Sequence, residues 1–420
     1  MVRSILRRQS ATDAWRFFRS ERGGGQGKGA RPEEARRLGI EMKGIIFMEK
    51  TRYKAYAHWL CQAAGMGSAG FLKSLEQVGT PEEIHAMAKR GILEEKLCGR
   101  RKRKAQQLEA FVKEYDVTAE YERLAERGIS FVLLGEEEYP GRLAAIPDAP
   151  YALYYVGKLP QDSVPAVAVV GARNCSGYGR NMARQFGEML ADAGVQVISG
   201  MARGIDGIGQ QAALDAGGYS LGVLGCGVDI CYPSEHRALY EKLIAEGGIC
   251  SEYPPGITPR SVLFPPRNRI ISGLCDGVLV IEAKECSGTL ITVDMALEQG
   301  REVYALPGRC TDPLSRGCNK LIRQGAEIVV SPQEFLHGIK AEGGKRTACR
   351  LEEFPLPAGI QGKLMQLLDL QPKSMETLQQ EYADVFGAHL TVPELCFELL
   401  ELCAADYADQ ISGSYYIRKR

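Results

Sequence analysis

The chain has 420 residues, of which 45% are hydrophobic, enough for about two or three domains with substantial cores. Its 52 lysines and arginines balance 52 aspartates and glutamates, which excludes a general basic field for nucleic acid, so any polyanion site must be local. No apolar run approaches the roughly 20 residues that cross a bilayer, and no cleavable signal segment is found, so we expect a cytoplasmic protein without membrane contact.

The 13 cysteines form no Cys-x-x-Cys pair, and their number is odd. In a long chain this usage is typical of free, buried thiols rather than of a disulfide framework. Cys226 and Cys231 are the closest pair in the central part of the chain. Two thiols without further ligands do not make a metal site, so we expect none there.

Residues 1–47 are rich in arginine and glycine and lack apolar periodicity, which predicts a disordered tail. A basic arm for nucleic acid and an over-long start of the chain are both alternatives. Residues 48–125 show helical periodicity, which predicts a small helical domain. The apolar residues at helical spacing are Trp59, Leu60, Phe71, Leu72 and Leu75.

A cationic run within this helical segment, "CGRRKRKAQQ" at residues 98–107, permits two interpretations. Pairs of helices joined by a glycine hairpin often contact the DNA backbone, and the cations would then bind phosphate. The alternative is a solvated charged helix face with no ligand.

Residues 126–336 contain short apolar runs, each followed by a glycine-rich turn and an amphipathic stretch. This alternation predicts an α/β domain with an extended Rossmann-like, doubly wound and mainly parallel sheet, preceded by one short strand at residues 130–134. The runs are "AVAVV", "VQVIS", "SLGVLG", "GVLVIEA" and "EVYAL".

A charged linker is predicted at residues 337–357. Residues 358–420 indicate about three short helices that end in a β-like hairpin, the size and order of a winged-helix domain.

In an open parallel sheet the ligand lies at the carboxyl ends of the strands, so the loops after the apolar runs are the candidate site. Backbone N–H groups at helix starts, together with arginine side chains, form an anion site and favour phosphate. Several arginines at one sheet edge would repel one another unless an anion offset their charge. The candidate phosphate ligands are Gly171 and Arg173, then Ser199, Gly200, Arg203 and Gly204, then Arg267, Asn268 and Arg269, and finally Ser287, Gly288 and Thr289.

The loops lack the marks of cofactor and metal chemistry. No Gly-x-Gly-x-x-Gly turn follows the first run, and no P-loop motif occurs, so neither NAD nor ATP is expected. The acidic residues lie singly in different loops, which does not suit a Mg²⁺ cluster for hydrolysis. We interpret Asp206 as a helix N-cap that fixes the Arg203 turn, and we expect no catalytic residue, metal or cofactor.

Taken in order, these loops resemble the bacterial DNA-processing protein A (DprA/Smf) family over nearly all of residues 131–330. The matching stretches include "VVGARNCSGYG", "ISGMARGID", "FPPRNRIISGL", "VLVIEAKECSGTLIT" and "GCNKLIRQGA". The segments on either side are similar to the SAM-like and winged-helix domains of that family.

This resemblance implies a non-catalytic protein that holds single-stranded DNA in a basic pocket and forms a homodimer through the Rossmann domain. It also implies that the protein protects incoming DNA and loads a RecA-type recombinase onto strands coated by single-strand-binding protein in natural transformation. By motif, the pocket residues would be Arg173, Ser199, Gly200, Arg203, Arg267 and Arg269, with Lys320 as a further candidate.

Two departures set limits to the resemblance: the first turn, and the tail before Met48, which matches nothing in the family. The first turn reads Gly-Ala-Arg, whereas the family has Gly-Ser-Arg, so this chain has no hydroxyl for phosphate at that position. In addition, the "SGT" helix start behind Glu282 is reminiscent of nucleoside-monophosphate phosphoribohydrolases, a nucleotide-processing enzyme alternative. Those enzymes carry a fuller Pro-Gly-Gly-x-Gly-Thr turn, which this chain lacks.

Overall fold

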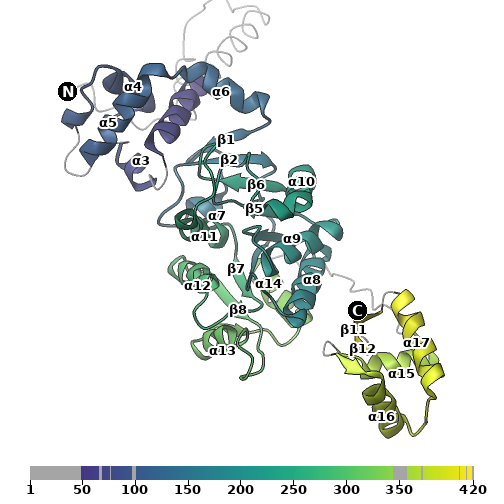
Figure 1. Cartoon of the computed structure of the whole chain (residues 1–420). Coiled ribbons are helices and arrows are strands. Elements are labelled where there is room, and N and C mark those ends of the chain that lie inside the picture. Colours follow the sequence, from purple (N-terminus) through teal and green to yellow (C-terminus); the bar gives the residue numbers. More distant parts are fainter. Residues whose placement is uncertain are drawn as a thin grey trace, which may run out of the picture. The chain divides into compact units, whose positions relative to one another are not determined.

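The computed structural model covers most of the chain beyond residue 48 (Figure 1). By its internal contacts, Lys54–Arg420 forms one unit. The predicted tail, residues 1–47, lies outside the described residues, as does most of the predicted linker. The described residues are 49–65, 69–75, 77–96, 101–343, 357–369, 372–405, 407–412 and 414–418.

The central region is built on a nine-stranded sheet of order β1-β2-β6-β5-β4-β3-β7-β8-β9. All neighbours from β6 to β9 are parallel, whereas β1 and β2 are antiparallel additions at one edge. The strands are β1 (Ser130–Leu133), β2 (Ala152–Gly157), β3 (Ala166–Val170), β4 (Gln196–Ser199), β5 (Ser220–Val223), β6 (Gly248–Ser251), β7 (Gly277–Val280), β8 (Glu302–Ala305) and β9 (Glu327–Ile328).

The prediction of an α/β fold with a mainly parallel, doubly wound sheet is confirmed. The five apolar runs form β3, β4, β5, β7 and β8, because strands buried on both faces read as continuous apolar stretches. The chain passes from β3 through β4 and β5 to β6, then returns to pair β7 with the other side of β3. This reversal places a ligand crevice at the carboxyl ends of β3 and β7.

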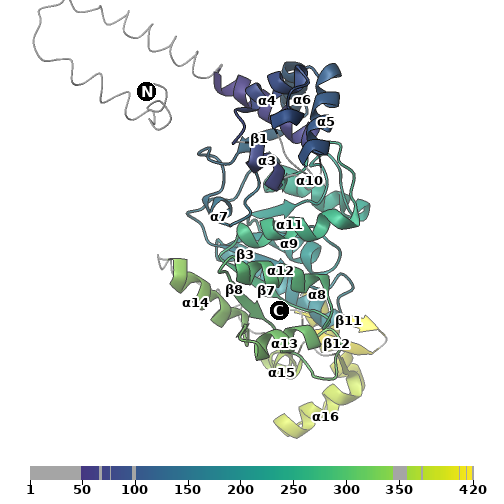
Figure 2. The same cartoon turned by 90° about the vertical axis from the view of Figure 1, so that its left-hand side faces the viewer.

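Helices cover both faces of the sheet (Figure 1 and Figure 2). Alternate residues of β3 enter opposite cores: Ala168 packs with Ile270 and Val293, and Val169 packs with Phe186. The helices are α7 (Gly141–Ala144), α8 (Gly177–Asp192), α9 (Ile205–Asp215), α10 (Arg237–Glu246), α11 (Phe264–Gly273), α12 (Gly288–Glu298), α13 (Arg316–Arg323) and α14 (Pro332–Gly343), with 3₁₀ turns η3 (Ser234–His236) and η4 (Ser261–Leu263).

An N-terminal helical region precedes the sheet, and all five apolar residues behind the helical prediction are buried in it. His58 Nδ1 and the Tyr154 hydroxyl of β2 form a hydrogen bond of 2.8 Å that links this region to the sheet. In addition to a helix over residues 49–64, it contains α3 (Ala69–Leu75), α4 (Pro81–Lys89), η1 (Glu94–Lys96), α5 (Arg101–Phe111), η2 (Val112–Glu114) and α6 (Val117–Glu126).

The C-terminal region has three helices and a small sheet of order β10-β12-β11. This is the predicted order of elements, and the winged-helix assignment and the domain boundaries stay predictions. Among the described residues, no helix is both long enough and apolar enough to span a membrane. The elements are α15 (Gly359–Leu367), β10 (Lys373–Ser374), α16 (Met375–Phe386), α17 (Val392–Ala404), β11 (Ala408–Ser412) and β12 (Tyr415–Arg418).

Candidate nucleic-acid interface

All four predicted loops meet in one cleft of about 610 Å³ at the crevice of the sheet, the second loop through Ala202 and Asp206. A smaller hollow of about 70 Å³ adjoins it and is lined by Gly200 and Arg203 of the second loop. Arg173 and Arg267 line both spaces. The other predicted residues that line the large cleft are Gly171, Asn268, Ser287, Gly288 and Thr289.

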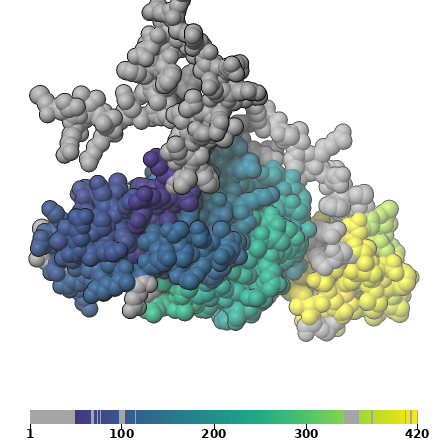
Figure 3. All heavy atoms as spheres, turned by 90° about the horizontal axis from the view of Figure 1, so that it is seen from above, coloured from purple at the N-terminus to yellow at the C-terminus, as the bar shows by residue number. Residues whose placement is uncertain are grey.

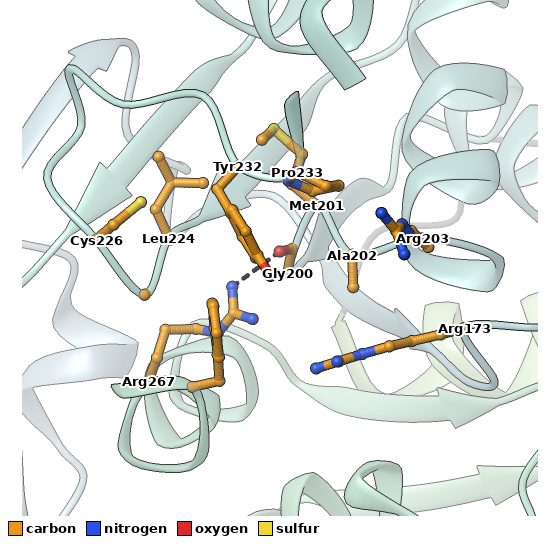
Figure 4. Close-up of a pocket in the computed structure, with 12 residues that line it drawn as sticks. Arg173, Gly200, Met201, Ala202, Arg203, Leu224, Cys226, Tyr232, Pro233 and Arg267 are labelled. Atoms are coloured by element: carbon orange, nitrogen blue, oxygen red, sulfur yellow. Dashed lines mark hydrogen bonds between the residues drawn. The ribbon is translucent and has the colours of Figure 1, made fainter. Parts of the chain in front are cut away.

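Arg267 of α11 is a buried cation at the floor of the smaller hollow (Figure 4). Its Nη1 donates to the carbonyl of Gly200 at 2.9 Å and also to the carbonyl of Val223. Burial lowers the pKa of Arg267, and the charge of Arg173 acts in the same direction, whereas the Asp206 carboxylate opposes the shift. A buried cation with a second guanidinium near it favours a nearby anion.

Asp206 holds the second loop, but the prediction that it is the N-cap is wrong. Helix α9 begins at Ile205, and its N-cap is Gly204, whose φ of 73° favours glycine. Asp206 is instead the second residue of α9, and its buried carboxylate accepts the N–H of Gly200 at 3.1 Å. Burial raises the pKa of this carboxyl, and Arg267 opposes the shift.

Arg203 is the exposed cation of the second loop, and its guanidinium forms an ion pair with the carboxylate of Glu235. Its Nη2 donates to Oε2 of Glu235 at 2.7 Å, and its Nε donates to the other carboxylate oxygen. Both side chains are about half exposed, at 59% and 50%. An ion pair in solvent contributes little, so a phosphate can compete with Glu235 for this guanidinium.

The fourth loop is an ordered helix start. Ser287 is the N-cap of α12 and accepts the N–H of Thr289 at 3.2 Å. The Thr289 hydroxyl donates to the carbonyl of Gly171 at 3.1 Å and so ties the fourth loop to the first. A Cβ added to Gly288 would meet nothing within 4 Å, so this glycine leaves open space at the cleft.

Four predicted residues line neither the cleft nor the smaller hollow. Ser199 is fully buried, and its hydroxyl donates to the carbonyl of Val169 at 2.6 Å, so it links β4 to β3. A Cβ on Gly204 would lie 2.3 Å from the carbonyl oxygen of Ala172, so this glycine permits two loops to pack. Lys320 lies on α13 and lines neither space.

Arg269, the fourth of these residues, is the clearest departure from prediction. It is two residues after Arg267 on α11, and it is buried in a different network. Its Nη2 donates to Oε2 of Glu252 at 2.6 Å, and its Nε donates to Oδ2 of Asp148 at 3.0 Å. About 100° of rotation per residue separates the two arginines by about 200° around the helix, so they cannot share one ligand.

Two aromatic residues that were not predicted from the sequence complete the site. Tyr232 and Phe264 stack with ring centroids 5.4 Å apart, and Tyr232 is 44% exposed. The guanidinium carbons of Arg173 and Arg267 lie 6.0 and 5.8 Å from the Phe264 ring centre. The available signal was "CYPSEH" and "LFPPRN" beside the glycine loops, but nothing in the sequence shows that they meet.

Catalytic alternatives receive no support from the geometry. Glu282 accepts both the N–H and the hydroxyl of Ser176, the N-cap of α8, and does not line the cleft. Its partner is thus a serine. Among the described residues, no cluster of three histidine, cysteine or acidic side chains could hold a metal ion, and Cys226 and Cys231 are free thiols.

Residues 130–340, half of the chain, match the family described as DNA recombination-mediator protein A. The chain belongs to this family. Curated relatives are similar to about half of the chain. Protein Smf of Escherichia coli is 47% identical over 205 residues, which cover 49% of this chain and 55% of the relative.

DNA processing protein DprA of Streptococcus pneumoniae is 44% identical over 207 residues, 49% of this chain and 73% of the relative. The X-ray structure of DNA processing protein A from the same organism superposes with a TM-score of 0.58 at 34% identity. It covers 68% of this chain and 98% of the solved chain. The chain thus matches little more than half of the E. coli relative's length.

Proposed function

We propose that this member of the DNA recombination-mediator protein A family binds single-stranded DNA in the cleft. One observation carries the proposal: the exposed Tyr232 stacks on Phe264, and Arg173 and Arg267 flank that stack. Single strands are held without sequence preference by cations that follow the phosphates and by aromatic faces on which bases stack. Duplex DNA has its bases paired and stacked internally, so it cannot use the aromatic face.

Arginine suits both parts of this task. Its planar fork engages two phosphate oxygens, and the same plane stacks on a base or on an aromatic ring. Arg173 is exposed and can adjust to a phosphate, whereas Arg267 is fixed by backbone carbonyls. The pair thus combines a mobile contact with a preorganised charge.

We propose further that the protein acts by binding and not by catalysis, and that it works in the cytoplasm. It would form a homodimer through the Rossmann-like region, protect incoming single strands and load a RecA-type recombinase onto DNA coated by single-strand-binding protein. Family membership supports this role. The position of Glu282 outside the cleft does not favour the phosphoribohydrolase alternative.

The test is a titration of a fluorescent oligothymidylate by anisotropy, in low and in high salt. We expect Arg173→Glu to weaken binding about tenfold or more at low salt and to lower the salt slope by about 0.7 for each phosphate that the protein no longer neutralises. Lys158→Glu is the control, because Lys158 is exposed and lines neither space. Equal affinity for duplex DNA, or normal binding by Arg173→Glu, would refute the proposal.

A further inference from the structure

A second basic hollow lies in the N-terminal helical region, the purple and blue part of Figure 3. It is a groove of about 720 Å³ between the end of α4 and the face formed by α5 and η2. The cleft of the central region shares no lining residue with it. Helix α4 stops at Lys89, and Gly91, with φ of 70°, turns the chain so that the N–H of Ile92 bonds to the carbonyl of Met87 at 3.1 Å.

Three exposed cations line this groove: Lys89, Arg90 and Lys113. Within the described part of the chain, none of them has an ion pair or a side-chain hydrogen bond. One acid, Glu109, also lines the groove, but its Oε1 already accepts the backbone N–H groups of residues 93 and 94 at 2.9 and 3.1 Å. The groove therefore keeps a net positive charge.

Two buried polar atoms of groove residues have no hydrogen-bond partner among the described residues, His85 Nε2 and the Tyr115 hydroxyl. An unpaired buried polar atom costs free energy. Burial, and next the charge of Lys89, lower the pKa of His85. The imidazole is therefore neutral near neutral pH, with one N–H to donate.

The rings of these two residues are already packed. His85 meets the ring of Trp59 edge-on with centroids 4.7 Å apart, and Tyr115 lies against Phe111 with centroids 5.0 Å apart. Each ring therefore already has an aromatic neighbour. The exposed cations of the groove favour a ligand with anionic oxygens.

The cationic surface continues along α5. Arg103 is exposed, and it lies on the same helix face as Gln106 and Ala110 of the groove, three and seven residues further on. The segment from Arg103 to Lys113 runs for about 15 Å at 1.5 Å per residue. That length spans several phosphates of one strand, which favours a polyanion over a single small anion.

We propose that this groove is a second DNA site, which binds the phosphodiester backbone through Lys89, Arg90 and Lys113 without contact to the bases. The proposal rests on the proposed function, because a protein that holds single-stranded DNA elsewhere supplies the polyanion. The backbone can come from the same single strand extended beyond the cleft or from a duplex next to it. Both present the same phosphate chemistry.

The experiment compares three DNA probes on the full chain by anisotropy: an oligothymidylate of about 8 nucleotides for the cleft alone, one of about 40, and the short one joined to a duplex. The variant is Lys89→Glu with Lys113→Glu. The control, Arg123→Glu with Lys158→Glu, changes the net charge equally at exposed positions outside the groove. Thermal unfolding checks the fold, and Lys89→Gln with Lys113→Gln is a milder second variant.

The groove variant should bind the short oligothymidylate like the unmodified protein. On the long single strand it should bind about tenfold more weakly, with a salt slope lower by about 1.4, because two fewer phosphates are neutralised at about 0.7 each. Weaker binding confined to the duplex probe also supports the groove and identifies a duplex as the source. Unchanged binding to both extended probes overturns the proposal. Failure of the unmodified protein to bind the short probe at all would instead refute the cleft.

Discussion

The ion pairs of Arg269 allow a test of whether this arginine stabilises the fold or binds DNA. The Arg269 side chain is 9% exposed, and that of its partner Glu252 is 12% exposed, whereas its other partner Asp148 is 62% exposed. Solvent screens the contact to Asp148, so most of the stabilisation lies in the pair with Glu252. Arg269→Met therefore leaves a buried carboxylate without its cation.

Breaking a buried ion pair in this way costs about 3–5 kcal/mol of unfolding free energy, and we expect that effect near neutral pH. Burial raises the pKa of Glu252, and Arg269 opposes the rise. Without the arginine the carboxyl takes up a proton more readily in the folded state. The deficit should therefore shrink as the pH falls and grow as the pH rises.

Urea unfolding followed by circular dichroism measures the effect, and Arg269→Met with Glu252→Gln is the matched double variant. The double variant should recover most of the missing stability, since neither side chain then carries a buried charge. Folded Arg269→Met should bind oligothymidylate normally. Full stability together with abolished DNA binding would refute the reasoning and return Arg269 to the DNA site.

Three further predictions concern the loops and the helical region. Gly204→Ala should lower the free energy of unfolding by about 2–3 kcal/mol, because Gly204 has a positive φ and is closely packed. Gly288→Ala should change the free energy of unfolding by less than about 0.5 kcal/mol. Equal effects of the two substitutions in urea unfolding would contradict this prediction. Glu235→Gln should tighten oligothymidylate binding roughly threefold at low salt by releasing Arg203, and weaker binding in the anisotropy titration would count against the competition. Burial lowers the pKa of His58 to about 4, so as the pH falls the unfolded chain binds a proton at this residue before the folded chain does. The free energy of unfolding should therefore fall by about 2 kcal/mol between about pH 7.5 and pH 5. Urea unfolding of His58→Gln should not show this fall.

The parallel core was predictable because burial on both faces forces continuous apolar runs, as in "AVAVV" for β3. The remaining strands carry a weaker pattern. β6 is the four-residue "GICS", and β9 has two residues, both exposed. β2 lies within a segment in which the only predicted strand was that at residues 130–134. Strands of this kind are defined by the neighbours with which they pair.

The candidate site was predictable in its loops but not in its side-chain directions. Arg267 and Arg269 look equivalent in "FPPRNRIISG", and only the rotation of α11 sends one to the cleft and the other to Glu252. Asp206 has the residue type of a cap, but the helix begins two residues too early for it. The stack of Tyr232 on Phe264 joins loops that no local pattern relates.

The most direct test of the central claim is a photocrosslink between the protein and an oligothymidylate that carries 5-bromodeoxyuridine, mapped by mass spectrometry. If single-stranded DNA lies in the cleft with a base on the aromatic stack, the crosslinked peptide contains Tyr232 or Phe264, and Arg173→Glu abolishes the crosslink. Crosslinks that bypass both aromatic residues and persist in Arg173→Glu would contradict the account.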